Sequence, residues 1–304
     1  MHRTATRAYT PAGVAAAAAG TFTWGVGIVL IKLTTSPFLI ASFYRHLLAV
    51  PILFVAWRLS SDKSLPWRAA GVGGVLFAMH QIAHFSSLRY STAAIVTILF
   101  SLQPILVGAL GGRVTGERTT PRFYAWSVVA IAGCAIVVLA STGTAETSLL
   151  GTTLAIVNLV AWSAYYLATK RAREDVTTIS WLLVMTTVSG ICIGLIALAA
   201  GQSFGVRTGR EWAYLATIAI LPGTIGHLLV TWAHPRIHAA ASSGIVLGVP
   251  IVAAAGAAIF IDEPFGPVHV LGALIALGAT AVAMRHLPPP VAEEAAERYG
   301  EVAT

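Results

Sequence analysis

Charged residues are scarce in this chain: only 10% of its 304 residues are Asp, Glu, Lys or Arg. Soluble globular domains carry about 25%, so this chain has too few solvated groups to cover a soluble fold. Hydrophobic residues make up 57% of the sequence, and the mean hydropathy is +0.79. The shortage of charge excludes soluble enzymes, secreted disulfide scaffolds and disordered regulators, and it predicts an integral membrane protein.

Cysteine is also rare. Cys134 and Cys192 each lie in an apolar run, which is typical of small buried side chains and not of a disulfide or a metal site. The sequence has no glycine-rich loop that could cradle a nucleotide phosphate, so direct drive by ATP is not expected. We predict no metal and no cofactor. The net charge of +7 is interpreted as Lys and Arg retained on the cytoplasmic side, and no nucleic-acid partner is expected.

Long runs without Asp, Glu, Lys or Arg divide the chain into segments that can cross a bilayer, which takes about 20 apolar residues per helix. Two short runs are separated only by Arg45, so we join them into one span with a buried charge. The runs are continuous, unlike the alternating strands of a β-barrel. The sequence predicts ten spans: 8–31, 33–44 joined to 46–57, 69–88, 90–112, 123–145, 147–169, 176–206, 212–235, 237–261 and 264–284.

The distribution of Lys and Arg predicts the orientation. With the N-terminus in the cytoplasm, 14 of the 19 Lys and Arg fall on the inner side, 4 fall on the outer side, and Arg45 lies within a span. Positive residues concentrate on the cytoplasmic side of membrane proteins. We therefore expect a multi-pass protein of the plasma membrane (the cell inner membrane) with both termini inside. Residues 1–13 form a cytoplasmic N-terminal segment, and residues 287–304 form a polar cytoplasmic tail.

The chain resembles itself. Each half holds five spans, an odd number, so the second half enters the membrane from the opposite side. Such inverted repeats are typical of secondary transporters. The paired residues are Trp24 with Trp162 and Lys32 with Lys170 at a shift of 138, and Pro104 with Pro250, Glu117 with Glu263 and Pro121 with Pro267 at a shift of 146. We predict an all-α integral membrane protein with ten transmembrane helices as two inverted five-helix repeats, 14–141 and 148–286.

The first half contains, in this order, Trp24, Arg45, 88–94, Pro104, Gly116, Glu117 and Gly133, and the second copy continues the pattern with 235–241, Pro250, 262–264 and Gly272. The order of these features resembles the EamA-type domain of the drug/metabolite transporter superfamily. The resemblance implies a ten-helix carrier with a central cavity that moves small organic molecules, among them amino acids and metabolites. Small multidrug relatives use a glutamate in the first helix for proton coupling, but 13–31 has no carboxylate here.

Arg45 is the first candidate site residue. A guanidinium near the middle of a span costs about 2.5–3.5 kcal/mol on insertion scales, and such residues face a cavity or a partner. No predicted span contains an acidic residue, so no intramembrane carboxylate is available to pair with it. Arg45 is expected either to hold a substrate carboxylate or phosphate, or to bind backbone carbonyls and fix helix packing.

Histidines and aromatic residues supply the other candidates. The spacing of His80 and His84 places both on one helical face, where they could carry a proton, contact substrate or form interhelical hydrogen bonds. No Asp, Glu or Cys accompanies them, which disfavours a metal. Aromatic rings well inside the spans are expected to face a cavity or pack in the core. The predicted substrate-binding set is Trp24, Tyr44, Arg45, His80, His84, Gln103, Trp162, Tyr166 and His227.

These observations predict a secondary transporter, and not an enzyme. It would move a small organic metabolite, amino-acid-like or drug-like, by alternating access through a central cavity. The alternative is a polytopic membrane enzyme that acts on a lipid-linked substrate, although the loops show no acidic cluster paired with histidine. A channel is disfavoured because no charged ring or carbonyl filter is found. The expected partners are a small-molecule substrate and the lipid bilayer, with protons as a candidate coupling ion, and the protein is expected to be a monomer or a homodimer.

Overall fold

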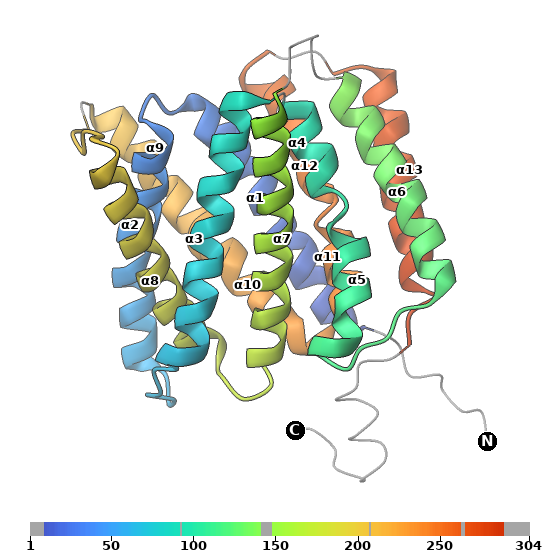
Figure 1. Ribbon diagram of the computed structural model, residues 1–304, viewed down its shortest axis with the longest axis horizontal. Coiled ribbons are helices and arrows are strands. Elements are labelled where there is room, and N and C mark those ends of the chain that lie inside the picture. Colours follow the sequence, from blue (N-terminus) through green and yellow to red (C-terminus); the bar gives the residue numbers. More distant parts are fainter. Residues whose placement is uncertain (1–8, 92, 141–147, 207, 263–264, 289–304) are drawn as a thin grey trace.

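The computed structural model describes residues 9–91, 93–140, 148–206, 208–262 and 265–288. Glu263, most of the predicted N-terminal segment and most of the predicted tail lie outside these residues. The described part is built from helices alone, apart from an isolated β-bridge between Tyr9 and Ile237 (Figure 1). The helices of the first half are α1 (Pro11–Leu33), α2 (Phe38–Leu59), α3 (Trp67–Tyr90), α4 (Ala93–Phe100), α5 (Gln103–Val114) and α6 (Pro121–Ala140).

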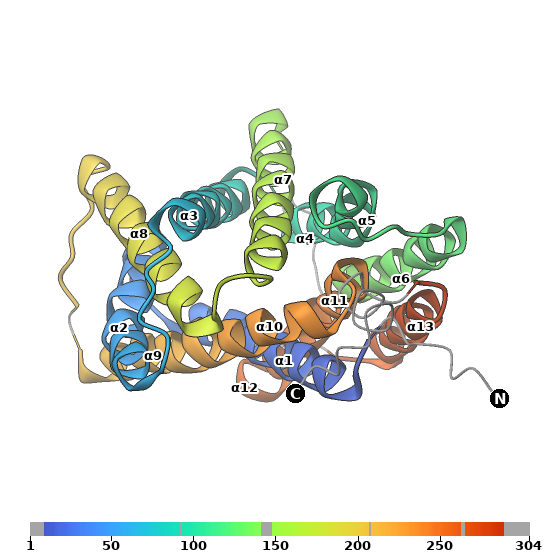
Figure 2. The same cartoon turned by 90° about the horizontal axis from the view of Figure 1, so that it is seen from below.

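The second half repeats this order with more interruptions. Its elements are α7 (Leu149–Ala172), α8 (Thr178–Ala199), α9 (Gly209–Ile220), the π-helix η1 (Leu221–Gly226), α10 (His227–Ala233), the 3-10 turn η2 (His234–Arg236), α11 (Ala239–Ile245), α12 (Gly248–Phe260) and α13 (Pro267–Met284). Viewed from below, α2, α3, α8 and α9 gather on one side and α5, α6 and α13 on the other, with α1, α7, α10 and α12 between them (Figure 2).

Ten crossings of the membrane follow from these elements. Nine segments of the described chain are long and apolar enough to span a bilayer. The remaining crossing is α3, which is 24 residues long but less apolar, because His80, Gln81 and His84 lie in its second half. The predicted fold class is confirmed: the described part of the chain is all-helical and contains ten spans.

One span begins earlier than the sequence indicated. The predicted run 212–235 starts after Glu211, whereas α9 begins at Gly209 and includes Glu211 in its first turn. The Thr208 side chain accepts a hydrogen bond from the N–H of Glu211 and so caps the helix N-terminus. An acidic residue is favoured in this first turn, where it faces the positive end of the helix dipole.

The two halves run in opposite directions. In Figure 1, α1 begins at the lower edge of the bundle, and α7 begins at the upper edge. The helix contacts of one half recur in the other. α3 packs against α7, and the corresponding α10 packs against α1. α7 packs against α4 and α5, and the corresponding α1 packs against α12. α2 packs against its own counterpart α8, and α6 packs against its own counterpart α13. The packing therefore has the pseudo-two-fold symmetry of an inverted repeat.

Matching spans of the two halves are broken at matching places. The fourth span is interrupted at Ser101–Leu102, between α4 and α5, and the ninth at Val246–Leu247, between α11 and α12. Pro104 and Pro250 lie in the first turns of α5 and α12, where a proline is compatible with a helix start but not with a helix that continues from before. Transporters build their binding sites from such discontinuous helices.

Carboxylates join the two halves at both ends of the α2–α8 interface. At the lower end, Asp62 accepts a hydrogen bond from Thr177 Oγ1 at 2.7 Å. At the other end, Glu211 accepts from the backbone N–H groups of Thr35 at 3.1 Å and Ser36 at 2.9 Å. In each case a carboxylate of one half binds at the start of a helix of the other half, so this interface is held at its two ends.

Candidate functional site

Phe77 of α3 lies at the centre of a cluster of aromatic rings, and its side chain is 1% exposed. The surrounding rings belong to α2, α3, α7 and α10, so both halves of the repeat contribute. Their centroids lie 5.0–6.2 Å from that of Phe77 and belong to His46, His80, Trp162, Tyr165 and His227. This group is called the Phe77 cluster below. Sequence reasoning missed Phe77; the signal that could have found it is that it lies three residues before His80, on the same helical face.

Arg45 of α2 reaches into this cluster. Its Nη2 donates a hydrogen bond to Nε2 of His227 over 2.7 Å, and its guanidinium carbon lies 5.6 Å from the centroid of the Phe77 ring. Since Nε2 of His227 accepts this bond, the proton of the neutral ring is on Nδ1. Among the described residues, no carboxylate pairs with Arg45. The guanidinium is therefore a lone cation inside the membrane-spanning bundle.

A small cavity lies beside this guanidinium. Its wall combines cationic, imidazole, hydroxyl and apolar groups from both halves of the repeat. The lining residues are Arg45, His46, Ala49, Phe77, Met185, Thr186, Gly223 and His227. Arginine presents five N–H donors, so donors that remain after the bond to His227 are available to an acceptor in this space. The arrangement suits a carboxylate.

The repeat mates Trp24 and Trp162 meet edge to face, with ring centroids 5.5 Å apart. Trp24 also packs on His227 at 4.9 Å, and Trp162 on His80 at 4.6 Å. Both indole Nε1 atoms are buried and have no hydrogen-bond partner in the described part of the chain, and the same holds for Nε2 of Gln103 at the start of α5. Buried donors without acceptors are rare in native proteins, and they suit a site that a polar ligand completes.

His80 and His84 are linked through Asn158 of α7. Nδ1 of His80 donates to Oδ1 of Asn158 at 2.5 Å, and Nδ2 of Asn158 donates to Nδ1 of His84 at 3.2 Å. The amide thus bridges two neutral rings whose protons are on opposite nitrogens. Asn158 was missed from the sequence, although a single amide within an apolar run is a signal that could have identified it.

Two predicted site residues lie further out. The Tyr166 ring packs on Trp162 at 5.9 Å, and its hydroxyl shares a short hydrogen bond with Ser242 of α11. Tyr44 instead donates to the carbonyl of Phe204 over 2.6 Å and packs on Trp212 at 4.9 Å. The structure therefore brings Trp24, Arg45, His80, His84, Trp162, Tyr166 and His227 into one connected group, and it places Tyr44 against the α8–α9 connection.

The π-helix η1 positions the wall opposite Arg45. A Cβ atom at Gly223 would lie 3.2 Å from Nε of Arg45, and one at Gly226 would lie 2.9 Å from Nε1 of Trp24. Only glycine fits such close approaches without displacing these side chains. Single π-turns within helices occur frequently at functional sites, and this one lies directly before His227.

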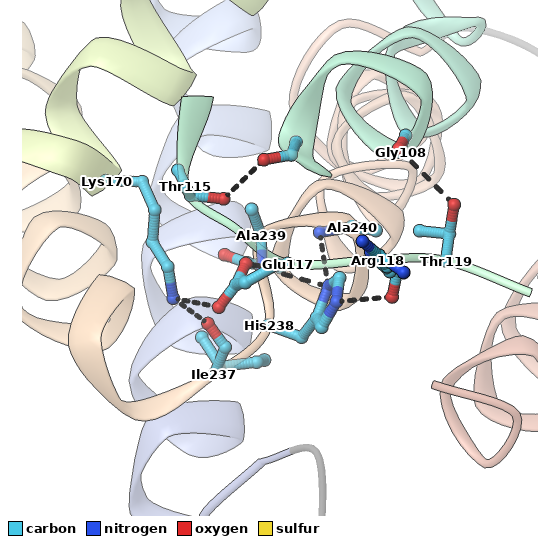
Figure 3. Close-up of polar contacts among 12 residues, drawn as sticks. Gly108, Thr115, Glu117, Arg118, Thr119, Lys170, Ile237, His238, Ala239 and Ala240 are labelled. Carbon is cyan, nitrogen blue, oxygen red and sulfur yellow. Dashed lines mark hydrogen bonds and ion pairs between the residues drawn. The ribbon is translucent and has the colours of Figure 1, made fainter. Parts of the chain in front are cut away.

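A second polar cluster lies at the lower end of the bundle (Figure 3). Nζ of Lys170 forms an ion pair with Oε1 of Glu117 at 2.8 Å and donates to the carbonyls of His234 at 2.5 Å and Ile237 at 2.7 Å. Nε2 of His238 donates to the carbonyl of Arg118 over 3.2 Å. Lys170 and Glu117 are 6% and 3% exposed, so both charges of this ion pair are buried.

His238 makes this cluster sensitive to pH. Burial lowers the pKa of His238 below its ordinary 6.5, Lys170 lowers it further, and Glu117 acts in the opposite direction. The neutral ring also accepts from the N–H of Ala240 at Nδ1 over 3.2 Å. Because the unfolded chain then binds more protons than the folded chain, the free energy of unfolding falls as the pH drops below 6.5.

We expect the melting temperature of the wild type to fall between about pH 7.5 and about pH 5.5, the range in which a free histidine titrates. The melting temperature of His238→Asn should fall less over this range, because asparagine does not titrate. An asparagine at the start of α11 can still accept a hydrogen bond from the N–H of Ala240. Thermal unfolding of both proteins across this pH range measures the difference. Equal slopes for the two proteins would contradict the assignment.

No group of three His, Cys, Asp or Glu side chains in the described ranges is arranged to hold a metal ion. The Phe77 cluster with Arg45 presents aromatic rings, unpartnered indole donors and one guanidinium.

Comparison with known proteins supports a transport role. The chain is 28% identical over 177 residues to the aromatic amino acid exporter YddG of Ancylobacter novellus, a stretch that covers 55% of this chain and 58% of that relative. A solved crystal structure superimposes with a TM-score of 0.78 at 18% identity, covering 89% of this chain and 96% of that one, which shows the fold. The EamA-like transporter family matches twice, over residues 11–139 and 149–285. The chain therefore belongs to the EamA-like transporter family and is a multi-pass membrane transporter of small molecules.

Proposed function

We propose that this protein exports aromatic amino acids or closely similar molecules by alternating access, with the Phe77 cluster and Arg45 as the substrate site. The observation that carries the proposal is the placement of a lone guanidinium beside a cluster of aromatic rings, between the two halves of an inverted repeat. The named activity of the YddG relative supports the choice of substrate class, and that relative is matched over little more than half of its length.

The chemistry of the cluster fits both parts of such a substrate. The rings of Trp24, Phe77 and Trp162 offer aromatic edges and faces, against which another aromatic ring gains about 0.5–1.5 kcal/mol beyond its buried area. The guanidinium of Arg45 and the unpartnered donors of Trp162 and Gln103 offer hydrogen bonds to a carboxylate. A guanidinium binds a carboxylate through two parallel N–H donors.

Alternating access is supported by the matched breaks in the fourth and ninth spans. α5 of the first half packs against α11 of the second half, and each is separated from the rest of its span by a break. Such half-helices can tilt without bending a continuous helix. Tilting α5 and α11 would open the Phe77 cluster to the lower side, and tilting α4 and α12, the upper halves of the same two spans, would open it to the upper side (Figure 1).

The remaining elements of the proposal rest on the sequence. The asymmetry of Lys and Arg supports an orientation in which the lower end of Figure 1 and both termini are on the cytoplasmic side of the plasma membrane. Protons are the proposed coupling ion, with the His80–Asn158–His84 chain as their path. The repeat bounds 14–141 and 148–286, the cytoplasmic segments 1–13 and 287–304, and a monomeric or homodimeric state remain predictions.

Transport by purified protein in proteoliposomes tests the proposal. Vesicles loaded with labelled L-phenylalanine or L-tryptophan should release it with saturable kinetics, faster when a pH gradient is imposed. Protein-free vesicles and a non-aromatic amino acid serve as controls. Conductance at channel rates, or turnover of a lipid substrate without movement of solute, would refute the transport mechanism.

A further inference from the structure

We propose that Glu117 and Lys170 form a latch that holds the two halves of the transporter together at the lower end and opens whenever that end opens. The inference rests on alternating access as proposed above. It concerns residues at the end of the bundle, away from the Phe77 cluster, and it assigns the Glu117–Lys170 pair a role in the conformational cycle.

The latch crosses from one half to the other. Glu117 belongs to the first half, since it follows α5, whereas its partners belong to the second half. Oε1 of Glu117 pairs with Nζ of Lys170 at the end of α7, and Oε2 accepts from the N–H of Ala239 at the start of α11 over 2.7 Å (Figure 3). Separation of α5 from α11 and α7 at this end must break all of these contacts.

The backbone fixes which charge lies on which side. The Glu117 carboxylate accepts the N–H of Ala239, and the Lys170 ammonium donates to the carbonyls of His234 and Ile237. An ammonium at position 117 would meet the N–H of Ala239, and a carboxylate at position 170 would meet two carbonyls. The latch is therefore polarised, and exchanging the two charges should not restore it.

Burial makes the latch reversible. Replacing a buried ion pair by apolar groups is often neutral for stability, because desolvation offsets the attraction between the charges. When this end opens, both groups of Glu117 and Lys170 regain water, so the contacts can break without leaving a charge in a dry interior. A buried ion pair therefore adds little net stability, and this suits a contact that must form and break in every transport cycle.

The rest of the fold leaves this end free to move. The α2–α8 interface is held at both ends by Asp62 and Glu211. α5, by contrast, has the break at Ser101–Leu102 at one end and Glu117 beyond the other. It can therefore pivot at the break, with the latch at the far end of the moving segment.

Accessibility of buried thiols tests the latch directly. Reporter cysteines replace Ser163 of α7 and, in a separate protein, Ser243 of α11, both of which are fully buried, after Cys134 and Cys192 have been changed to alanine. A membrane-impermeant thiol reagent is applied from the lower side, that is, to inside-out vesicles if the predicted orientation holds, and from both sides otherwise.

Glu117→Gln should increase the labelling rate of at least one reporter about tenfold, the factor that about 1.4 kcal/mol gives in an equilibrium. Glu117→Gln combined with Lys170→Met leaves no unpaired buried charge, so it protects the test against misfolding. It should also increase labelling, because Met leaves the buried carbonyls of His234 and Ile237 without their donor when this end is closed. The matched control is Glu174→Gln, which breaks the exposed ion pair between Arg171 and Glu174 within the second half and should not change labelling.

The charge exchange Glu117→Lys with Lys170→Glu completes the test. The labelling rate should stay high in this protein, because the backbone groups then face the wrong charges. Wild-type labelling rates in folded Glu117→Gln and in the double variant, or restoration by the exchanged pair, would overturn the latch. Labelling needs no substrate, so a failure of the proposed transport activity would be seen separately, in the proteoliposome assay.

Discussion

Arg45→Ala is expected to weaken binding of aromatic amino acids about a hundredfold, or about 3 kcal/mol, the range found when one partner of a buried charge pair is truncated. The loss follows because Arg45 is the cation that the cavity beside Phe77 presents to a carboxylate. Phenethylamine, which has the ring and the amine but no carboxylate, should bind the variant and the wild type about equally. Binding of both compounds to purified protein measures the effect.

Two further measurements separate substrate contact from packing. Arg45→Lys keeps the charge but loses the planar fork, so it should recover only part of the affinity for the amino acid. If Arg45 instead serves helix packing through its bond to His227, Arg45→Ala should lower the melting temperature and leave the affinity of the folded fraction unchanged. That result would remove Arg45 from the site.

The sequence predicted much of the cluster because two physical signals coincide there. A lone cation cannot face lipid, which fixes the direction of Arg45, and repeat mates such as Trp24 and Trp162 meet where the halves meet. Phe77 carried no such signal, since a phenylalanine in an apolar run is equally suited to the core. Tyr44 shows the limit of proximity in sequence: it precedes Arg45 by one residue, and adjacent helical residues face different directions.

The polar cluster of Glu117, Lys170 and His238 shows what an internal repeat can and cannot predict. The sequence aligned Glu117 with Glu263 and Lys32 with Lys170, because each alignment compares a residue with its own copy. In the structure, the glutamate of the first half pairs with the lysine of the second. A repeat alignment gives equivalent positions and not contacts, so this pair, like the π-helix before His227, required the three-dimensional packing.

Gly133→Ala is expected to lower the free energy of unfolding by about 3 kcal/mol, at the upper end of the usual cost of overpacking. A Cβ atom at Gly133 of α6 would lie 2.5 Å from the backbone nitrogen of Ala276 and 2.7 Å from the carbonyl oxygen of Gly272, both in α13. Because these are backbone atoms, no side-chain rotation can relieve the overlap, and α6 and α13 must move apart.

Gly272→Ala should act in the same direction, since its Cβ would lie 2.8 Å from the carbonyl oxygen of Gly133. The matched control is Gly278→Ala in the same helix, where a Cβ atom would meet nothing within 4 Å and alanine is the better helix former. Thermal unfolding in one detergent measures the effect. Gly133→Ala and Gly272→Ala should lower the melting temperature, and Gly278→Ala should leave it unchanged or raise it. Equal melting temperatures for all three would mean that α6 and α13 are not in direct backbone contact. In that case the close contact between α6 and α13, which joins the last helix of one half to the last helix of the other, would not hold the two halves together.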